Sequence, residues 1–212
     1  MKMNSTIRLI RMFAAVLAWF LFVAGNALAH CDTMDGPVVR AAKQALKTRN
    51  INYVLIWVKP KDEAEIRQAF RQTHIVRRLN RSARALADRY FFETLVRIHR
   101  AGEGQPYTGL KPAGTDLGPV IPVADKALEN GAIAPLLKLF PDSARPEIVN
   151  RFNEASAKKN FNHNDVAAGR KYVAAYTSFL EYLEHLNRHA ISTSHNISTN
   201  QAEVHHNCGS FI

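Results

Sequence analysis

The chain repeats part of its own sequence at a constant offset, and this repeat most constrains the fold. Matching residues lie 82 positions apart and require almost no gaps, which indicates a duplicated unit of about 80 residues. The matching positions are Gly36-Pro37-Val38 with Gly118-Pro119-Val120, Ala42 with Ala124, Ala45-Leu46 with Ala127-Leu128, Ile51 with Ile133, Glu65-Ile66 with Glu147-Ile148, Phe70 with Phe152, and Arg89-Tyr90 with Lys171-Tyr172.

Apolar residues recur at helical spacing in both copies. A proline suits the opening turn of the first helix, near Pro37 in one copy and Pro119 in the other. The short apolar runs 53–58 and 133–140 are predicted to be helical, because Pro135 and two leucines disfavour a strand in the second run. The sequence therefore predicts an all-α helical bundle from two fused pseudo-repeats of about three helices each. The longer helices are predicted over residues 62–77, 81–100, 145–160 and 165–188.

The N-terminal segment, residues 1–29, has the three parts of a secretory signal peptide. Lys2, Arg8 and Arg11 give a positive start, an apolar run follows, and Ala27-Leu28-Ala29 supplies small residues before the cut. The apolar run is short for a membrane span, although an uncleaved anchor is the alternative. We expect a secreted or periplasmic mature chain that spans positions 30–212, with His30 first and no transmembrane helix.

Composition divides the rest of the chain. A loop rich in glycine and proline separates the two helical copies, and a segment of Ser, Thr, Asn and His follows the second copy. The predicted parts are a signal peptide (1–29), a first helical unit with an N-terminal metal-binding segment (30–100), a Gly/Pro-rich loop (101–117), a second helical unit (118–189) and a disordered His-rich tail (190–212).

Cleavage after Ala29 would place three metal-binding groups on two adjacent residues. The α-amine and imidazole of His30 would stand beside the thiol of Cys31. The amine and the thiol have pKa values of about 8 and about 8.5, a metal ion deprotonates both, and a chelate forms through the intervening amide. Soft sulfur with nitrogen favours nickel or copper, leaves zinc or iron as alternatives, and disfavours magnesium or calcium. The hook, residues 30–36, is therefore predicted to bind a transition metal ion; the alternative is that it merely begins the chain.

Further ligands must come from the bundle, because the hook leaves coordination positions unfilled. His99 is the first candidate, since it ends a predicted helix beside the glycine-rich loop. Glu181 is the second, because it is the repeat equivalent of His99, and Asp35 is the third, from its place in the hook. Glu103 and Tyr107, in the loop, are the candidate catalytic residues. The alternatives are a helix-end histidine that stabilises the helix dipole and two solvated loop residues.

The chain has two cysteines, Cys31 and Cys208, and an exported protein can join such a pair in a disulfide. That bridge is the alternative to a metal-binding thiol. The tail also carries His195, His205 and His206, which could collect metal ions loosely or have no such role.

The first residues, His30-Cys31-Asp32 followed by Gly36, resemble the N-terminus of nickel superoxide dismutases. The resemblance implies nickel bound by the terminal amine, the imidazole, the thiolate and the following main-chain amide. Asp35 stands where that family has a second cysteine, and loss of one thiolate would change the potential of the nickel.

The mature chain also resembles a family of uncharacterised exported bacterial proteins, which implies a helical exported protein and supplies no activity. The segments that carry this resemblance are residues 30–37, 89–104 and 106–112.

The formal net charge is +10, and +7 remains once Lys2, Arg8 and Arg11 leave with the signal peptide. Export and the alternation of basic with acidic residues argue against a nucleic-acid partner. A solvated basic surface, which could lie near anionic lipid, is the better interpretation.

We therefore predict an exported, transition-metal-binding helical protein. Its leading function is that of a superoxide dismutase-like redox enzyme, with superoxide or a related small oxidant as a partner beside the metal ion. A metal-binding or metal-storing protein without turnover is the second interpretation, and a helical interaction module is the third. The sequence leaves a homo-oligomer open.

Overall fold

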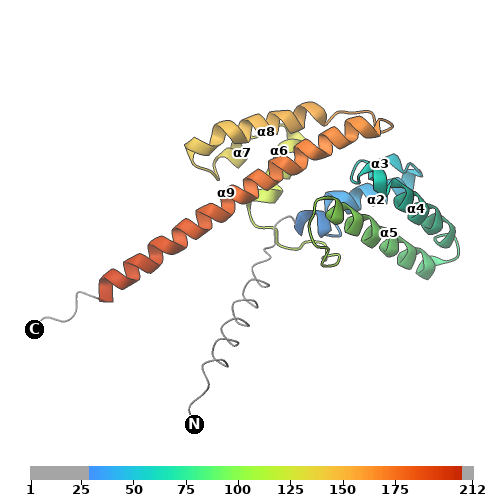
Figure 1. Ribbon diagram of the computed structural model, residues 1–212, viewed down its shortest axis with the longest axis horizontal. Helices are drawn as coiled ribbons and strands as arrows, with labels where there is room; N and C mark the ends of the chain where they lie inside the picture. Colours follow the sequence, from blue (N-terminus) through green and yellow to red (C-terminus); the bar gives the residue numbers. More distant parts are fainter. Residues whose placement is uncertain (1–28, 207–212) are drawn as a thin grey trace, which may run out of the picture.

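The computed structural model describes the backbone of residues 29–206 and the side chains of residues 30–188. Every regular element in these ranges is a helix, as predicted, and residues 53–58 form no strand (Figure 1). Residues 1–28 of the predicted signal peptide, and Cys208, lie outside the described part. In chain order the elements are η1 (Ala29–Asp32), α2 (Pro37–Thr48), α3 (Asn52–Leu55), η2 (Pro60–Asp62), α4 (Glu63–Val76), α5 (Arg81–Gly102), α6 (Val120–Asn130), α7 (Ala134–Leu137), η3 (Asp142–Ala144), α8 (Arg145–Lys158) and α9 (Val166–His206).

The bounds of three consecutive elements recur at the predicted offset. α3, η2 and α4 begin and end 82 positions before α7, η3 and α8, respectively. Within the described part each half holds four α-helices, not the three predicted, because the short apolar runs form separate one-turn helices. Duplication of the sequence itself stays a prediction.

Proline and glycine set the limits of the first helix of each half. Pro37 occupies the first turn of α2, whose inward stripe includes the fully buried Val38 and Ala42. α6 ends at Gly131, which adopts the left-handed conformation with φ of 78° that glycine favours. These helices pack on α5 and α9, the longest helix of each half.

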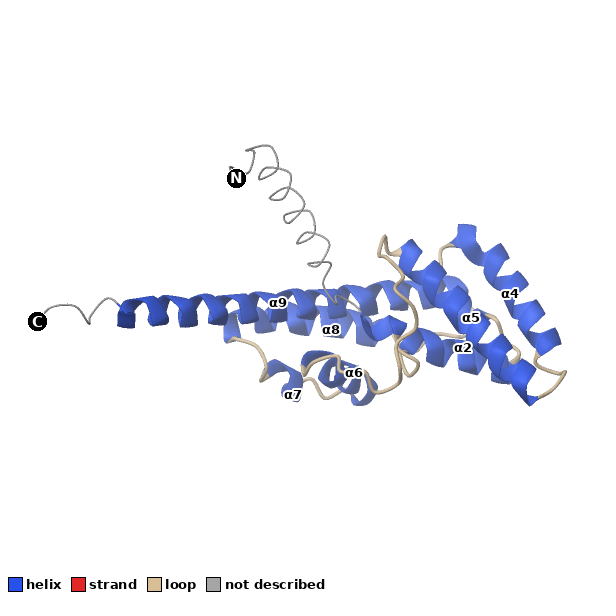
Figure 2. Ribbon diagram, turned by 90° about the horizontal axis from the view of Figure 1, so that it is seen from below, coloured by secondary structure: helices blue, strands red, loops and turns tan. Residues whose placement is uncertain are grey.

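Helix α9 joins the two halves, since it lies along α8 and also reaches the end of α3 (Figure 2). Arg170 of α9 donates to the Val58 carbonyl oxygen at 3.0 Å and to Glu63 of α4 at 2.6 Å. Gly169 permits this approach, because a Cβ atom there would overlap Ile56 Cγ2 and lie 2.9 Å from a ring carbon of Phe161. The first turns of α9 are therefore fixed against the other half of the chain.

The predicted disordered tail differs from the structure. α9 continues to His206, through most of residues 190–212. The sequence explains the difference, because no glycine or proline interrupts the chain between Arg170 and Cys208. None of the helices in the described residues is both long and apolar enough to cross a membrane.

Replacing Gly169 with alanine should destabilise the fold by about 1–3 kcal/mol, because the added methyl group overlaps Ile56. Gly102→Ala is the matched control: it is also helical, and its Cβ would meet only Lys59 side-chain atoms, the nearest at 3.8 Å. That change should be neutral or stabilising, since alanine is the better helix former. Urea denaturation of both variants measures the difference, and equal stabilities would contradict this view of the α9 contact.

Candidate functional site

The hook is buried at the centre of the molecule rather than trailing from it. The exposed fractions of His30, Cys31 and Asp32 are 4%, 1% and 2%. The Gly/Pro-rich loop holds this segment, because the Lys111 amide donates to the Asp32 carbonyl oxygen at 2.8 Å and the Lys111 carbonyl accepts from Met34 at 3.0 Å. The loop is therefore a clamp on the hook as well as a connection between the two halves.

Gly36 allows the hook to turn sharply into α2. Its amide donates to the Thr33 carbonyl oxygen at 3.0 Å, and a Cβ atom at this position would overlap the His30 carbonyl oxygen. Only glycine leaves room for that close approach. The invading side chain would displace His30 itself.

His30 is oriented by residues from two helices of the second half. Its Nε2 lies 2.7 Å from Oδ2 of Asp125 in α6, and its Nδ1 lies 3.3 Å from the hydroxyl of Tyr176 in α9. That hydroxyl donates its hydrogen to Oδ1 of Asp125 at 2.8 Å. Since a carboxylate accepts hydrogen bonds, Nε2 carries a hydrogen and donates it to Asp125. Nδ1 faces the Tyr176 hydroxyl on the buried hook.

Cys31 is a free thiol in the described part of the chain. Burial raises its pKa well above the ordinary value, and the negative charge of Glu103 adds to the rise, while Arg100 opposes it. The thiol is therefore protonated and unreactive at neutral pH unless a cation compensates the thiolate. Cys208, its alternative disulfide partner, lies outside the described residues.

Beside His30 and Cys31 lies a polar cluster of the buried Asp32, His99 and Arg100 with the half-buried Glu103. Arg100 of α5 lies between the two acids, with its Nε 3.4 Å from Asp32 and its Nη1 donating to Glu103 at 3.1 Å. Burial raises the pKa of Asp32 and of Glu103, and in both cases Arg100 opposes the rise. A buried carboxylate without a cation would cost several kcal/mol. The guanidinium of Arg100 offsets this cost for Asp32.

His99 is oriented by the Trp57 backbone and faces Glu103. His99 Nδ1 lies 2.9 Å from the Trp57 carbonyl oxygen, which can only accept, so Nδ1 carries the hydrogen. Nε2 is then a lone pair, 3.3 Å from Oε1 of Glu103. Neither atom has a hydrogen-bond partner among the described residues in this arrangement. Burial lowers the pKa of His99 to about 4 and raises that of Glu103, whereas Arg100 opposes the rise at Glu103.

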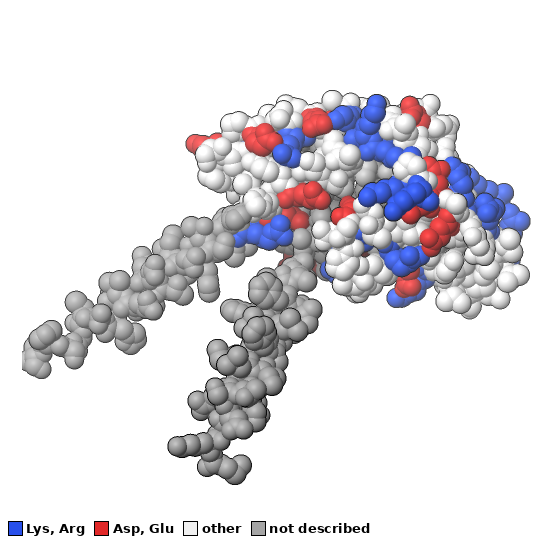
Figure 3. Space-filling view, viewed as in Figure 1, with Lys and Arg blue, Asp and Glu red and all other residues white. Residues whose placement is uncertain are grey.

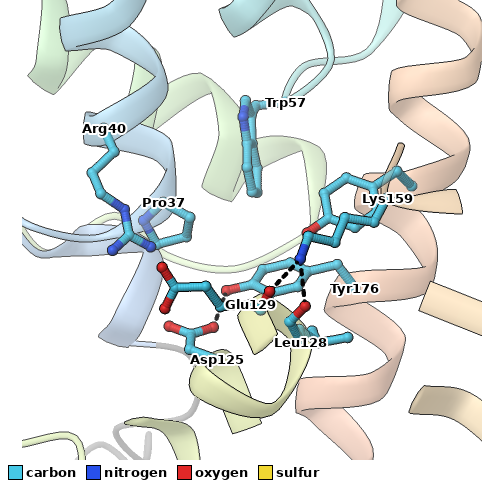
Figure 4. Close-up of a pocket in the computed structure, with 9 residues that line it drawn as sticks. Pro37, Arg40, Trp57, Asp125, Leu128, Glu129, Lys159 and Tyr176 are labelled. Carbon is cyan, nitrogen blue, oxygen red and sulfur yellow. Dashed lines mark hydrogen bonds between the residues drawn. The ribbon is translucent and has the colours of Figure 1, made fainter. Parts of the chain in front are cut away.

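Three cavities open around the hook and the polar cluster. One of about 390 Å³ contains Asp125 and Tyr176, with Arg40 and Glu129 nearby and Lys159 donating to the last carbonyls of α6 (Figure 4). One of about 450 Å³ is lined by His30, Lys111, Asp116 and Glu184 among others. A third of about 340 Å³ reaches His99 and Glu103. Small molecules can therefore approach both His30 and His99 from solvent.

The structure brings together only some of the predicted site residues. His30 and Cys31 are adjacent and buried, and His99 is paired with Glu103 as described above. Asp35 is exposed and accepts a hydrogen bond from Gly114 at 2.8 Å, so it anchors the loop. Glu181 is exposed too, and desolvation together with the charge of Glu103 raises its pKa, which places it toward the polar cluster.

Tyr107 is half-buried against the core, and burial together with the charges of Glu93 and Asp32 raises its pKa. Among the described residues no group of three or more His, Cys, Asp or Glu side chains converges as a metal site. The structure thus offers the hook two side-chain donors and shows no third.

Sequence reasoning missed Asp125, Asp32, Arg100 and Tyr176 as parts of the site. Asp125 offered no sequence signal, because it follows the buried Ala124 directly and neighbouring residues of a helix point to different faces. Arg100, beside His99, offered no sequence signal. Its burial follows from the packing of α5 alone.

Fold and site define an all-α protein in which His30, Cys31 and Asp32 are buried beside polar side chains. A model of a family of unknown function (DUF6448) matches residues 35–182, and the chain belongs to this family. The matched range begins at Asp35, so His30 and Cys31 precede it. No curated protein and no solved structure matches the chain.

In the metal-free protein, His99→Gln should reduce the fall in the free energy of unfolding between pH 7 and pH 5. The folded pKa of His99, about 4, lies below the unfolded value of about 6.5. The stability contributed by neutral His99 is therefore present above pH 6.5 and falls as the unfolded chain takes up the proton. Between pH 7 and pH 5 this loss is about 2 kcal/mol.

Urea denaturation of parent and variant at both pH values checks the effect. Asp32 and Glu103, whose raised pKa values act in the opposite direction, are present in both proteins, so the difference isolates His99. Parallel pH profiles would show that His99 is not held neutral.

Proposed function

We propose that the mature chain binds a transition metal ion, nickel or copper in preference to zinc or iron, through His30 and Cys31. The observation that carries the proposal is the state of His30. Asp125 accepts the Nε2 hydrogen at 2.7 Å, so Nδ1, next to the buried Cys31, is the nitrogen that can bind a metal ion while the Tyr176 hydroxyl donates to Asp125. A histidine ligand whose other nitrogen donates to a carboxylate is the usual arrangement at metal centres.

The remaining donors must come from the main chain. Because side chains alone supply too few ligands in the described part, the site requires the α-amine that signal-peptide cleavage would create at His30. That amine and Nδ1 belong to one residue and can form one chelate ring. The amide nitrogen and thiolate of Cys31 can form a second. Residues 30 and 31 thus fit a soft transition metal, and they do so only after cleavage.

The polar cluster supports a redox role at such a site. A bound nickel or copper ion would supply one-electron chemistry, the kind that superoxide dismutation needs. Reduction of superoxide also consumes protons, and Glu103, whose pKa burial raises, lies 3.3 Å from His99 at a cavity of about 340 Å³. Glu103 is therefore the proton donor we propose, with Arg100 holding its second oxygen at 3.1 Å.

Metal binding by the correctly cleaved chain is the first test. The mature protein should begin at His30, as N-terminal sequencing would show. Calorimetric titration with Ni²⁺ and Cu²⁺ should then give a tight site that Cys31→Ser weakens at least ~10-fold, because the thiolate is its softest ligand. Cys208→Ser, the other cysteine, is the matched control and should leave the affinity unchanged.

Three outcomes discriminate among the functions. Equal affinity in the parent and Cys31→Ser would exclude the hook as the metal site. Metal binding without superoxide or peroxide turnover would favour a storage or carrier protein. A purified protein that neither contains nor takes up metal would favour an interaction module.

Asp125→Asn should weaken metal binding by about 10-fold while preserving the fold. The amide can present its NH₂ group to Nε2, which would move the imidazole proton to Nδ1 and remove that ligand. Asp116→Asn is the control: Asp116 lines the same cavity as His30, and its hydrogen bond from Gly118 at 2.8 Å survives in asparagine. A loss of affinity in both variants alike would point to net charge rather than to the orientation of His30.

A further inference from the structure

The end of the molecule where α4 turns into α5 exposes apolar side chains to solvent. In this α4–α5 tip, residues 71–90, the exposed fractions are 70% for Leu79 and Leu86, 67% for Ile75 and 48% for Tyr90. Among the described residues the other large hydrophobic side chain that is exposed is Leu139, at 45%, in the second half. Four of five such residues therefore lie in one hairpin.

Helix geometry directs these side chains away from the core. α4 buries Phe70 and Thr73, and Ile75 lies on the opposite face with Arg71 four residues before it. On α5, Leu86 and Tyr90 are also four residues apart and share one face. Ile75, Leu86 and Tyr90 are thus not the rim of a buried cluster, because their own helices present them to solvent. Leu79 lies in the turn between α4 and α5.

Arginines surround the exposed apolar side chains. Arg71, Arg78, Arg81 and Arg84 are exposed, and no carboxylate of residues 30–188 lies within ion-pair distance of them. The acids of the tip and its border are already engaged, Asp88 by Arg77 and Glu93 by Arg89. Figure 3 shows Lys and Arg side chains gathered over the end of the molecule that carries α4 and α5.

The tip is held in shape before any partner binds. Asn80 caps α5 by accepting from the Ala83 amide at 2.9 Å, and Arg84 donates to the Arg77 carbonyl oxygen at 3.4 Å. Arg77 in turn donates to the Leu46 carbonyl oxygen at 3.4 Å, which ties the turn to α2. The exposed residues are therefore presented by an ordered surface, which reduces the entropic cost of docking.

We propose that the α4–α5 tip docks on an anionic lipid surface. The tip carries aliphatic side chains between arginines that lack a carboxylate partner among residues 30–188. A membrane interface offers a site for both, because apolar residues enter the acyl boundary and cations contact the headgroup phosphates. A nucleic acid would satisfy the arginines but would leave Ile75, Leu79 and Leu86 exposed. The docking surface is independent of the metal site, since no residue of the hook or the polar cluster belongs to it.

Sedimentation with phospholipid vesicles tests the proposal on the mature chain. The protein should bind vesicles that contain phosphatidylglycerol, bind pure phosphatidylcholine weakly, and lose binding as salt is raised. Arg78→Gln with Arg81→Gln should lower partitioning at least ~10-fold, since each cation near the surface contributes about 1 kcal/mol. Leu79→Ser with Leu86→Ser should lower it by a similar factor.

Matched controls lie in the second half of the chain. Leu139→Ser removes an exposed hydrophobic residue and Lys126→Gln an exposed cation, and each should change partitioning by less than about twofold. Equal binding by the parent and both tip variants would overturn the proposal. So would tip variants that lose affinity for double-stranded DNA alone, or a parent dimer that the Leu79/Leu86 variant dissociates in the absence of lipid.

Discussion

Burial of the ionisable hook is the constraint on which the arrangement of the long helices depends. His30 and Asp32 are almost inaccessible to solvent, and an unmatched charge in such a place would cost several kcal/mol. Asp125 of α6 pairs with His30, and Arg100 of α5 pairs with Asp32. Because these partners come from different halves of the chain, the hook holds α5 and α6 in position as much as they hold the hook.

The early end of α3 provides the other link between the halves. A helix that continued past Leu55 would use the carbonyls of Trp57 and Val58 in its own hydrogen bonds. Since α3 stops after one turn, the first carbonyl accepts from His99 at 2.9 Å and the second from Arg170 at 3.0 Å. One turn of irregular backbone thereby orients the polar cluster and anchors α9. It also fixes the tautomer of His99, whose Nε2 then faces Glu103.

The sequence was sufficient to predict the helices but not the contacts between residues of different helices. Periodicity located the longer helices, and the repeat correctly favoured a helix over a strand at residues 53–58, because each copy constrains the other. The contact between Asp125 and His30 could not be predicted, since it joins residues far apart in the chain and depends on how α6 packs. From the sequence alone, Asp125 is interpreted as a solvated residue of a helix. Only the tertiary structure shows the His30 imidazole beside it.

The site residues divide along the same line. His30 and Cys31 were chosen from local chemistry, because an imidazole and a thiol are adjacent in the sequence. His99 was chosen for its place at a helix end, and the structure instead gives it a buried partner, Glu103, one helical turn later. Asp35 was chosen from a pattern, and its carboxylate binds Gly114. Sequence spacing identifies donors that are neighbours in the chain, whereas burial decides which distant ones become neighbours in space.

Signal-peptide cleavage would change the electrostatics of the hook and couple maturation to metal binding. In the uncleaved chain the nitrogen of His30 is a neutral amide, and His30 as a whole is 4% exposed. Cleavage would convert that nitrogen to an amine that is cationic at neutral pH, in a place where desolvation disfavours charge. A metal ion would displace the proton from the amine and from Cys31 together, so ligand binding would relieve a cost that processing creates. A ligand that binds only the folded mature chain also stabilises that chain by mass action. The metal-free mature chain would then be less stable than both the uncleaved chain and the metal-bound mature chain.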